Sequence, residues 1–191
     1  MRKFAKLDEP EIIASLKTGG IGVIPTDTLY GIVARAADQT AVERVYKVRG
    51  RAPEKPCIVL VSDLTQIPDK TAWTRAHYDL AARYWPGPLS LVAPITETPT
   101  YLHRGTGSLA YRVPENGELR KLLSATGPLI APSANLEGEP PATTIEQAKA
   151  YFGDAVDFYV DYGELKNEPS TLVSVEAGQP KVLRQGALKV Y

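Results

Sequence analysis

Small polar side chains follow two apolar segments of this sequence, at the point where each segment ends. Residues 23–31 (VIPTDTLYG) pass from a short apolar run into hydroxyl and carboxylate groups, and residues 128–135 (PLIAPSAN) pass into a hydroxyl and an amide. Buried strands that end in this way usually bring side chains to a binding site, because strand ends meet at one edge of a sheet. The two segments therefore predict a shared polar site.

A cluster of cations lies between these segments. Residues 49–56 (RGRAPEKP) bring Arg49, Arg51 and Lys55 close together, and such a cluster is costly unless an anion lies nearby. Guanidinium groups bind phosphate and carboxylate through paired hydrogen bonds. The cluster therefore predicts a pocket for a phosphorylated ligand.

Composition narrows the classes of function. The 191 residues include 22 Lys plus Arg and 22 Asp plus Glu, so no net charge favours a dedicated nucleic-acid or membrane binder. Residues 35–55 nevertheless carry six basic and three acidic side chains, and residues 154–168 carry five acidic and one basic, which predicts a cationic site beside an acidic flank. With one cysteine and no apolar run near the roughly 20 residues that cross a bilayer, we expect a cytoplasmic protein without a membrane partner.

Hydrophobic periodicity and turn residues indicate which elements hold these groups. The pattern mixes helices and strands without a strict repeat, and no linker divides the chain, so we expect one domain over residues 1–191 of α/β (α+β) class, with helices packed on a sheet. Expected helices are 10–18, 40–49, 74–84, 118–124 and 144–152, the last capped by Thr143 or Thr144. Expected strands are 21–24, 57–61, 89–93, 109–113, 128–131, 158–160, 171–175 and 181–183.

Several residues that could do chemistry are better explained by structure. Cys57 lies in a continuous apolar run and is expected to be inert packing, and Tyr30 and Trp85 are expected in the core. Asp27 is expected to bond the backbone of its own turn. The two histidines, His77 and His103, are not spaced with Cys57 as zinc ligands.

The order of the motifs resembles that of the YrdC family, whose bacterial members include the TsaC-type threonylcarbamoyl-AMP synthases. The resemblance covers nearly the whole chain and rests on six blocks in the family's order. These blocks are PTDTLYG at 25–31, RGR at 49–51, WPGPLS at 85–90, RVP at 112–114, PSAN at 132–135, and the closing pair PSTLV at 169–173 with LRQG at 183–186.

The resemblance implies a YrdC-like twisted mixed sheet that encloses a concave basic pocket. It also implies an enzyme, a nucleotidyltransferase, that joins L-threonine, bicarbonate and ATP into L-threonylcarbamoyl-adenylate and releases pyrophosphate, for the t6A modification of tRNA. Such chemistry depends on positioning and on cations rather than on a covalent nucleophile. Mg²⁺ would arrive with ATP and be held mainly by phosphate oxygens.

Site residues follow from the same motifs. Arg49 and Arg51 are implied as catalytic residues. The implied ATP-binding residues are Arg51, Lys55, Ser108, Asn135, Thr143 and Arg184. The implied threonine-binding residues are Thr28, Arg112, Ser133 and Ser170, with Arg112 expected to hold the carboxylate through two hydrogen bonds unless it forms a surface ion pair with an acid such as Glu115.

The sequence departs from the family pattern at two positions. Arg49 replaces the usual lysine with its charge kept, and because Arg49→Lys restores the usual family residue we expect that variant to retain activity. Leu60 lies where many longer members place a threonine-contacting histidine, which shorter members often lack. The chain also ends soon after the LRQG block, so we expect it to lack the additional C-terminal domain of the longer synthases.

Two alternatives to the synthase remain at this stage. One is an RNA-binding module that would use Arg44, Lys47, Arg49 and Arg51 against phosphates. The other is a YciO-like paralogue that prefers a different acceptor. Binding of tRNA and of other t6A-pathway proteins is compatible with either an enzyme or a module.

Overall fold

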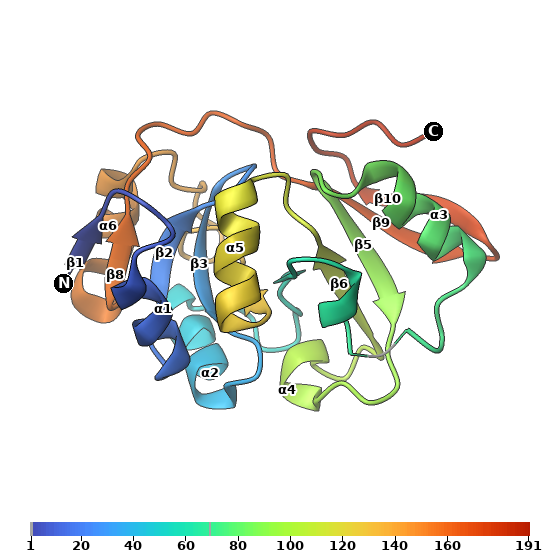
Figure 1. The fold of residues 1–191 in the computed structure, drawn as a ribbon, viewed down its shortest axis with the longest axis horizontal. Coiled ribbons are helices and arrows are strands. Elements are labelled where there is room, and N and C mark those ends of the chain that lie inside the picture. The colour runs from blue at the N-terminus through green and yellow to red at the C-terminus, as the bar shows by residue number, and fades with distance from the viewer. Residues whose placement is uncertain (1, 69) are drawn as a thin grey trace.

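The described residues form one large mixed sheet covered by helices on both faces (Figure 1). The computed structural model describes residues 2–68 and 70–191. Within them, ten strands lie side by side in one sheet of parallel and antiparallel pairs. In spatial order they are β1 (Arg2–Phe4), β8 (Phe158–Val160), β2 (Gly22–Pro25), β3 (Tyr30–Arg35), β7 (Leu129–Ile130), β4 (Val59–Leu60), β6 (Ser108–Arg112), β5 (Leu89–Pro94), β9 (Thr171–Glu176) and β10 (Gln179–Arg184).

Helices on opposite faces bury two separate apolar clusters. The smaller cluster contains buried residues of α1 (Pro10–Lys17) and α5 (Gly117–Thr126), which contact each other. The larger one contains buried residues of α2 (Gln39–Arg49), α3 (Arg75–Tyr84) and α6 (Ile145–Phe152). A short helix α4 (Thr100–His103) and two 3₁₀ turns, Leu64–Gln66 and Gly153–Ala155, complete the set of helical segments in the described chain.

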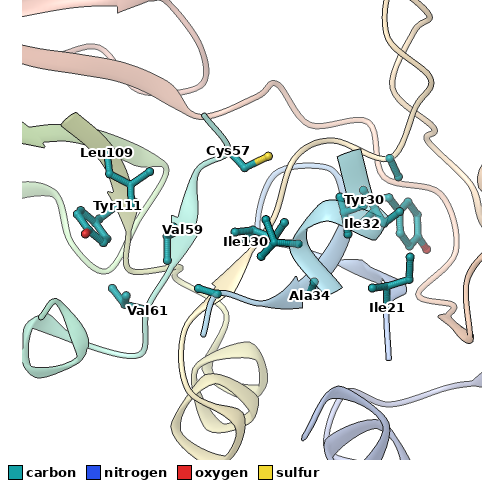
Figure 2. Packing of buried hydrophobic residues seen from close by; sticks show 14 of the residues in the cluster. Ile21, Tyr30, Ile32, Ala34, Cys57, Val59, Val61, Leu109, Tyr111 and Ile130 are labelled. Carbon is teal, nitrogen blue, oxygen red and sulfur yellow. The ribbon is translucent and has the colours of Figure 1, made fainter. Parts of the chain in front are cut away.

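Alternating side chains divide each central strand between the two clusters. In β3, Tyr30, Ile32 and Ala34 enter the larger cluster while Val33 enters the smaller one. This is the period of two expected when a strand is buried on both faces. Figure 2 shows residues of β3, β4, β6 and β7 meeting in the larger cluster. The sheet is therefore a rigid base whose strand ends can hold side chains in fixed positions.

Local capping explains where the helices begin and end. Asp38 accepts a hydrogen bond from the backbone of Ala41 at the start of α2, and Gly50 ends that helix in the left-handed conformation. Asn116 caps α5 in the same way as Asp38 caps α2. None of the helices in residues 2–68 and 70–191 is long and apolar enough to cross a membrane.

The expected elements are confirmed with shifts of a few residues, and three further ones were missed. The strand expected at 57–61 is reduced to β4, and the strand at 128–131 is reduced to β7. The short elements β1 and α4 carry weak patterns. The larger omission is β3, whose first residues Tyr30 and Gly31 were interpreted only as the end of the PTDTLYG block although they already pair with β2.

Candidate active site

The turn between β2 and β3 is closed by the hydroxyl of Thr26. Its Oγ1 accepts hydrogen bonds from the backbone N–H groups of Thr28 and Leu29, both at 3.2 Å, and donates to the Leu29 carbonyl at 2.6 Å. We expected Asp27 to bond this turn, but Thr26 does so because its side chain points back into it. The turn holds Thr28 Oγ1 3.1 Å from Thr26 Oγ1.

Asp27 instead pairs with a buried arginine. Arg112, the last residue of β6, is 4% exposed; its Nη2 lies 3.2 Å from Asp27 Oδ1, and its Nη1 donates to Thr28 Oγ1 at 3.0 Å. The alternative of a surface ion pair with an acid such as Glu115 is corrected in two respects, because the acid is Asp27 and the pair is buried. The Glu115 backbone N–H donates to Asp27 Oδ2 at 3.1 Å. Burial lowers the pKa of Arg112 and the Asp27 charge opposes that shift.

The loop after β7 is organised by a second buried arginine. Arg49, 2% exposed, donates from Nε to the Asn135 carbonyl at 2.9 Å and from Nη2 to Asn135 Oδ1 at 3.1 Å. The Asn135 amide nitrogen donates to the carbonyls of Leu136 and Glu139, and Ser133 Oγ donates to Asn135 Oδ1 at 2.7 Å. The Asn135 side chain is thus committed to contacts within the protein.

A third group joins β5, β9 and β10. Ser170 Oγ lies 2.7 Å from Ser90 Oγ, and both residues are buried. Arg184 Nη2 donates to the Ser170 carbonyl at 2.9 Å, and burial lowers the pKa of this arginine. A Cβ on Gly186 would lie 2.1 Å from the Pro169 carbonyl oxygen, so only glycine allows the chain after β10 to lie against this segment.

The basic loop between α2 and β4 is folded around one arginine. Arg51 donates from Nε to the Lys55 carbonyl at 3.1 Å and from Nη2 to the Pro56 carbonyl at 2.9 Å. The ring of Tyr46 lies under the Arg51 guanidinium at 5.9 Å, and its hydroxyl donates to the Lys55 carbonyl at 2.8 Å. Lys55 Nζ contacts Glu137 at 2.7 Å.

A pocket of about 640 Å³ lies where these groups meet. It is lined from the β2–β3 turn, the basic loop, the segment after β7 and the segment that leads into β9. Its charged lining residues are three arginines and one glutamate, Arg51, Arg112, Arg184 and Glu168. A second hollow of about 420 Å³ shares Thr28, Asn167 and Glu168 with it.

Seven of the predicted site residues line this pocket and four do not. The seven are Thr28, Arg51, Arg112, Ser133, Thr143, Ser170 and Arg184. The four outside its lining are Arg49, Lys55, Ser108 and Asn135.

Two of the four, Arg49 and Asn135, are buried outside the pocket lining and are hydrogen-bonded to each other. A third, Lys55, forms an ion pair with Glu137. Ser108 begins β6, the strand that Arg112 ends, and at a rise of about 3.3 Å per residue this puts it on the order of 13 Å from the pocket end. The roles of these four residues toward ATP stay predictions. Of the four, Ser108 is the least suited to contact a ligand in the observed pocket.

The open choice of a helix cap is decided in favour of Thr144. Its Oγ1 accepts from the Gln147 backbone N–H at the start of α6, which leaves Thr143 at the pocket. Cys57 is buried, and burial raises the pKa of its thiol, as expected for a packing residue that also touches the pocket. Trp85 packs against the larger cluster, as expected.

A strap of residues 161–168, which follows β8 and leads to the PSTLV block, was expected only as part of an acidic flank and not as pocket lining. The Tyr30 hydroxyl donates to the Gly163 carbonyl at 2.7 Å and accepts from the Tyr162 N–H at 3.0 Å, so this core tyrosine also anchors the strap. Asn167 and Glu168 of the strap line both hollows. The acidic flank expected at residues 154–168 includes Glu168, but no local pattern marks the anchor of the strap, because Tyr162 and Gly163 lie more than 130 positions from Tyr30.

Together the fold and the pocket define an α/β protein with a pocket lined by strand-end hydroxyls and arginines. A family model, Sua5_yciO_yrdC, described as "Telomere recombination", matches residues 14–186. The chain belongs to this Sua5/YciO/YrdC family.

Known relatives are similar to this chain in sequence and in structure. The chain is 35% identical to a Mycobacterium tuberculosis relative over 91% of its own length and 82% of the relative's. It is 32% identical to the Pyrococcus abyssi threonylcarbamoyl-AMP synthase, over 91% of its length but only 52% of that protein's. The solved structure of P. abyssi Sua5 complexed with L-threonine superposes with a TM-score of 0.88 at 30% identity, covering 97% of this chain and 57% of that one.

Proposed function

We propose that this chain is an L-threonylcarbamoyladenylate synthase, a nucleotidyltransferase that uses L-threonine, bicarbonate and ATP with Mg²⁺. The observation that carries the proposal is the position of Arg112 and Thr28 in the same pocket as Arg51. One end of the pocket thus offers a charge and a hydroxyl for an amino acid, and another offers a cation for phosphates. The relative complexed with L-threonine supports the first assignment.

Threonine would bind between Arg112 and the strand-end hydroxyls. A guanidinium has five N–H donors, and Thr28 and Asp27 engage one terminal nitrogen each, so donors remain for a carboxylate. Ser133 and Ser170 line the same pocket and can meet the substrate hydroxyl. Asp27 neutralises the arginine from the side of the second hollow, which keeps the guanidinium in place when the pocket is empty.

The reaction needs two bonds to form in sequence. The threonine amine attacks the carbon of bicarbonate and loses water overall, which gives a carbamate. A carbamate oxygen then attacks the α-phosphorus of ATP, and the bond from that phosphorus to the bridging oxygen breaks to release pyrophosphate. Arg51 would stabilise the charge that builds on the leaving group, with Arg184 and Thr143 available to the nucleotide. Mg²⁺ bound to the phosphates would neutralise the same charge.

Arg49 takes a different role from the one that its motif implied. Its Nε and Nη2 donate to Asn135, its Nη1 is buried without a hydrogen-bond partner among the residues that the structure describes, and its side chain does not line the pocket, so it would act by positioning the loop that carries Ser133 rather than by touching phosphate. The RNA-binding alternative is less favoured for the same reason, since Arg49 is buried and Arg44 is paired with Asp157 at 2.7 Å.

The test is formation of the labelled product. Purified protein with Mg-ATP, threonine and ¹³C-bicarbonate should yield threonylcarbamoyl-adenylate that carries the label, detected by mass spectrometry. Serine should support less product, and valine, which leaves the pocket hydroxyls unpaired, should support very little. A folded protein that binds ATP but forms no labelled adenylate would refute the synthase. Pyrophosphate release that ignores threonine would favour the paralogue with another acceptor.

A further inference from the structure

One carboxylate contacts two cations of the basic loop at the edge of the pocket. Glu137 Oε1 lies 2.7 Å from Lys55 Nζ, and its Oε2 lies 3.7 Å from Arg51 Nη1. Each oxygen of the carboxylate therefore faces a different cation. The hydrogen bond from Lys55, together with the charges of Lys55, Arg51 and Arg49, lowers the pKa of Glu137 despite some desolvation, so this side chain is ionised at neutral pH.

The Glu137 carboxylate lies where two cations of the basic loop, Lys55 and Arg51, converge. Arg51 is fixed by the carbonyls of Lys55 and Pro56, which leaves its Nη1 directed toward Glu137. Arg51 also lines the pocket, so the anion position adjoins the space where a ligand would bind. Arginine and lysine that converge on one carboxylate can bind a phosphate in the same way, because both anions present oxygen acceptors to the same donors.

The backbone of Glu137 is held firmly while its side chain is not. Its N–H donates to the Arg49 carbonyl at 2.9 Å, and the adjacent turn is closed by a hydrogen bond from Glu139 to Leu136. The side chains of Lys55, Glu137 and Arg51 keep 57%, 30% and 17% of their exposure, so water reaches the contact. Exposed ion pairs of this kind are weak and exchange partners readily. A rotation of the Glu137 side chain is sufficient to free both cations.

We propose that Glu137 acts as an internal competitor for the phosphates of ATP, holding Lys55 and Arg51 in the empty protein and releasing them when the nucleotide binds. The inference rests on the proposed function, because it takes ATP as the ligand at this edge. A polyphosphate carries more charge than one carboxylate and displaces it, while the competition lowers the affinity for ATP. Glu137 thus sets the ATP concentration at which the pocket fills.

The experiment compares three ligands with three proteins. Mg-ATP, inorganic pyrophosphate and adenosine are titrated by calorimetry into the unmodified chain, Glu137→Gln and Glu139→Gln. The Glu139→Gln control removes the same charge from an exposed residue two positions away. Glu137→Gln should bind Mg-ATP and pyrophosphate roughly two- to tenfold more tightly, with adenosine unchanged and with a difference that shrinks in high salt. Glu139→Gln should match the unmodified chain, and Glu137→Ala should change affinity in the same direction as Glu137→Gln.

The outcomes separate this inference from the proposed function. Unchanged affinity in Glu137→Gln, or no phosphate binding by any of the proteins, would overturn the competitor. Weaker binding of Mg-ATP by that variant would also overturn it, because it would make Glu137 a ligand of the substrate complex. Tighter binding of Mg-ATP by Glu137→Gln, without labelled adenylate from the unmodified chain, would support the competitor and refute the synthase. Labelled adenylate, with unchanged affinity of Glu137→Gln for Mg-ATP, would support the synthase and refute the competitor.

Discussion

Replacing Arg49 by lysine keeps the positive charge but removes the planar guanidinium that donates two hydrogen bonds to Asn135. The sequence pattern led us to expect that Arg49→Lys would retain activity, because lysine is the usual family residue. The structure changes that expectation, since the buried guanidinium reaches two oxygens of Asn135 at 2.9 and 3.1 Å. A lysine has one compact ammonium on a flexible stem, and it can satisfy one of these oxygens in the same geometry.

The size of the effect follows from the lost contact. A buried hydrogen bond to a charged group is worth about 1.5–3 kcal/mol, and we expect the free energy of unfolding of Arg49→Lys to fall by about that amount. If the same loss displaces the loop with Ser133 and Asn135 in the folded protein, substrate affinity would fall by between roughly ten- and 150-fold, at about 1.4 kcal/mol per factor of ten.

Two measurements separate loss of stability from loss of binding. Urea unfolding followed by tryptophan fluorescence gives the free energy of unfolding, and calorimetry at a temperature where the variant is folded gives the affinities for threonine and Mg-ATP. Lys47→Arg, a charge-conserving change on an exposed residue of the same helix, is the matched control. If Arg49→Lys unfolds at the same urea concentration and turns over normally, charge alone is required at this position and the positioning role is refuted.

Two further substitutions test other parts of the site. Thr28→Val keeps the shape of the side chain but removes the acceptor for Arg112 at 3.0 Å, so threonine affinity should fall by roughly tenfold or more while adenosine affinity is unchanged; an equal loss for both ligands in calorimetry would contradict the assignment. Gly186→Ala places a methyl group against the Pro169 carbonyl and should lower the thermal midpoint and shift Arg184; an unchanged midpoint and unchanged ATP affinity would show that the chain after β10 can move without cost.

Local patterns in the sequence were sufficient for most of the fold. Helix caps and glycine stops act over three or four residues, and for that reason α2, α5 and α6 were expected nearly where they occur. The strand β3 was missed for an equally local reason: its residues Tyr30 and Gly31 also belong to a binding motif, and only pairing with β2 reveals them as strand. The pairing of β3 with β2 is a local hairpin, whereas its pairing with β7 joins residues that lie far apart in the sequence.

The sequence determined which kinds of side chain belong to the site. The tertiary structure decided which of them line the pocket and which support the loops around it. The motifs indicated that hydroxyls and arginines from distant segments belong together, and Thr28, Arg112, Ser133 and Ser170 do line one pocket. Whether an arginine lines the pocket or bonds a neighbouring loop depends on which loops lie next to each other in the folded chain.

Arg51 and Arg49 illustrate that dependence, because they are two residues apart, yet one lines the pocket and the other is bonded to Asn135, 86 positions away. Glu137, 82 positions from Lys55, lacks any sequence signal for the same physical reason: an ion pair across two loops exists only after the sheet has brought their ends together.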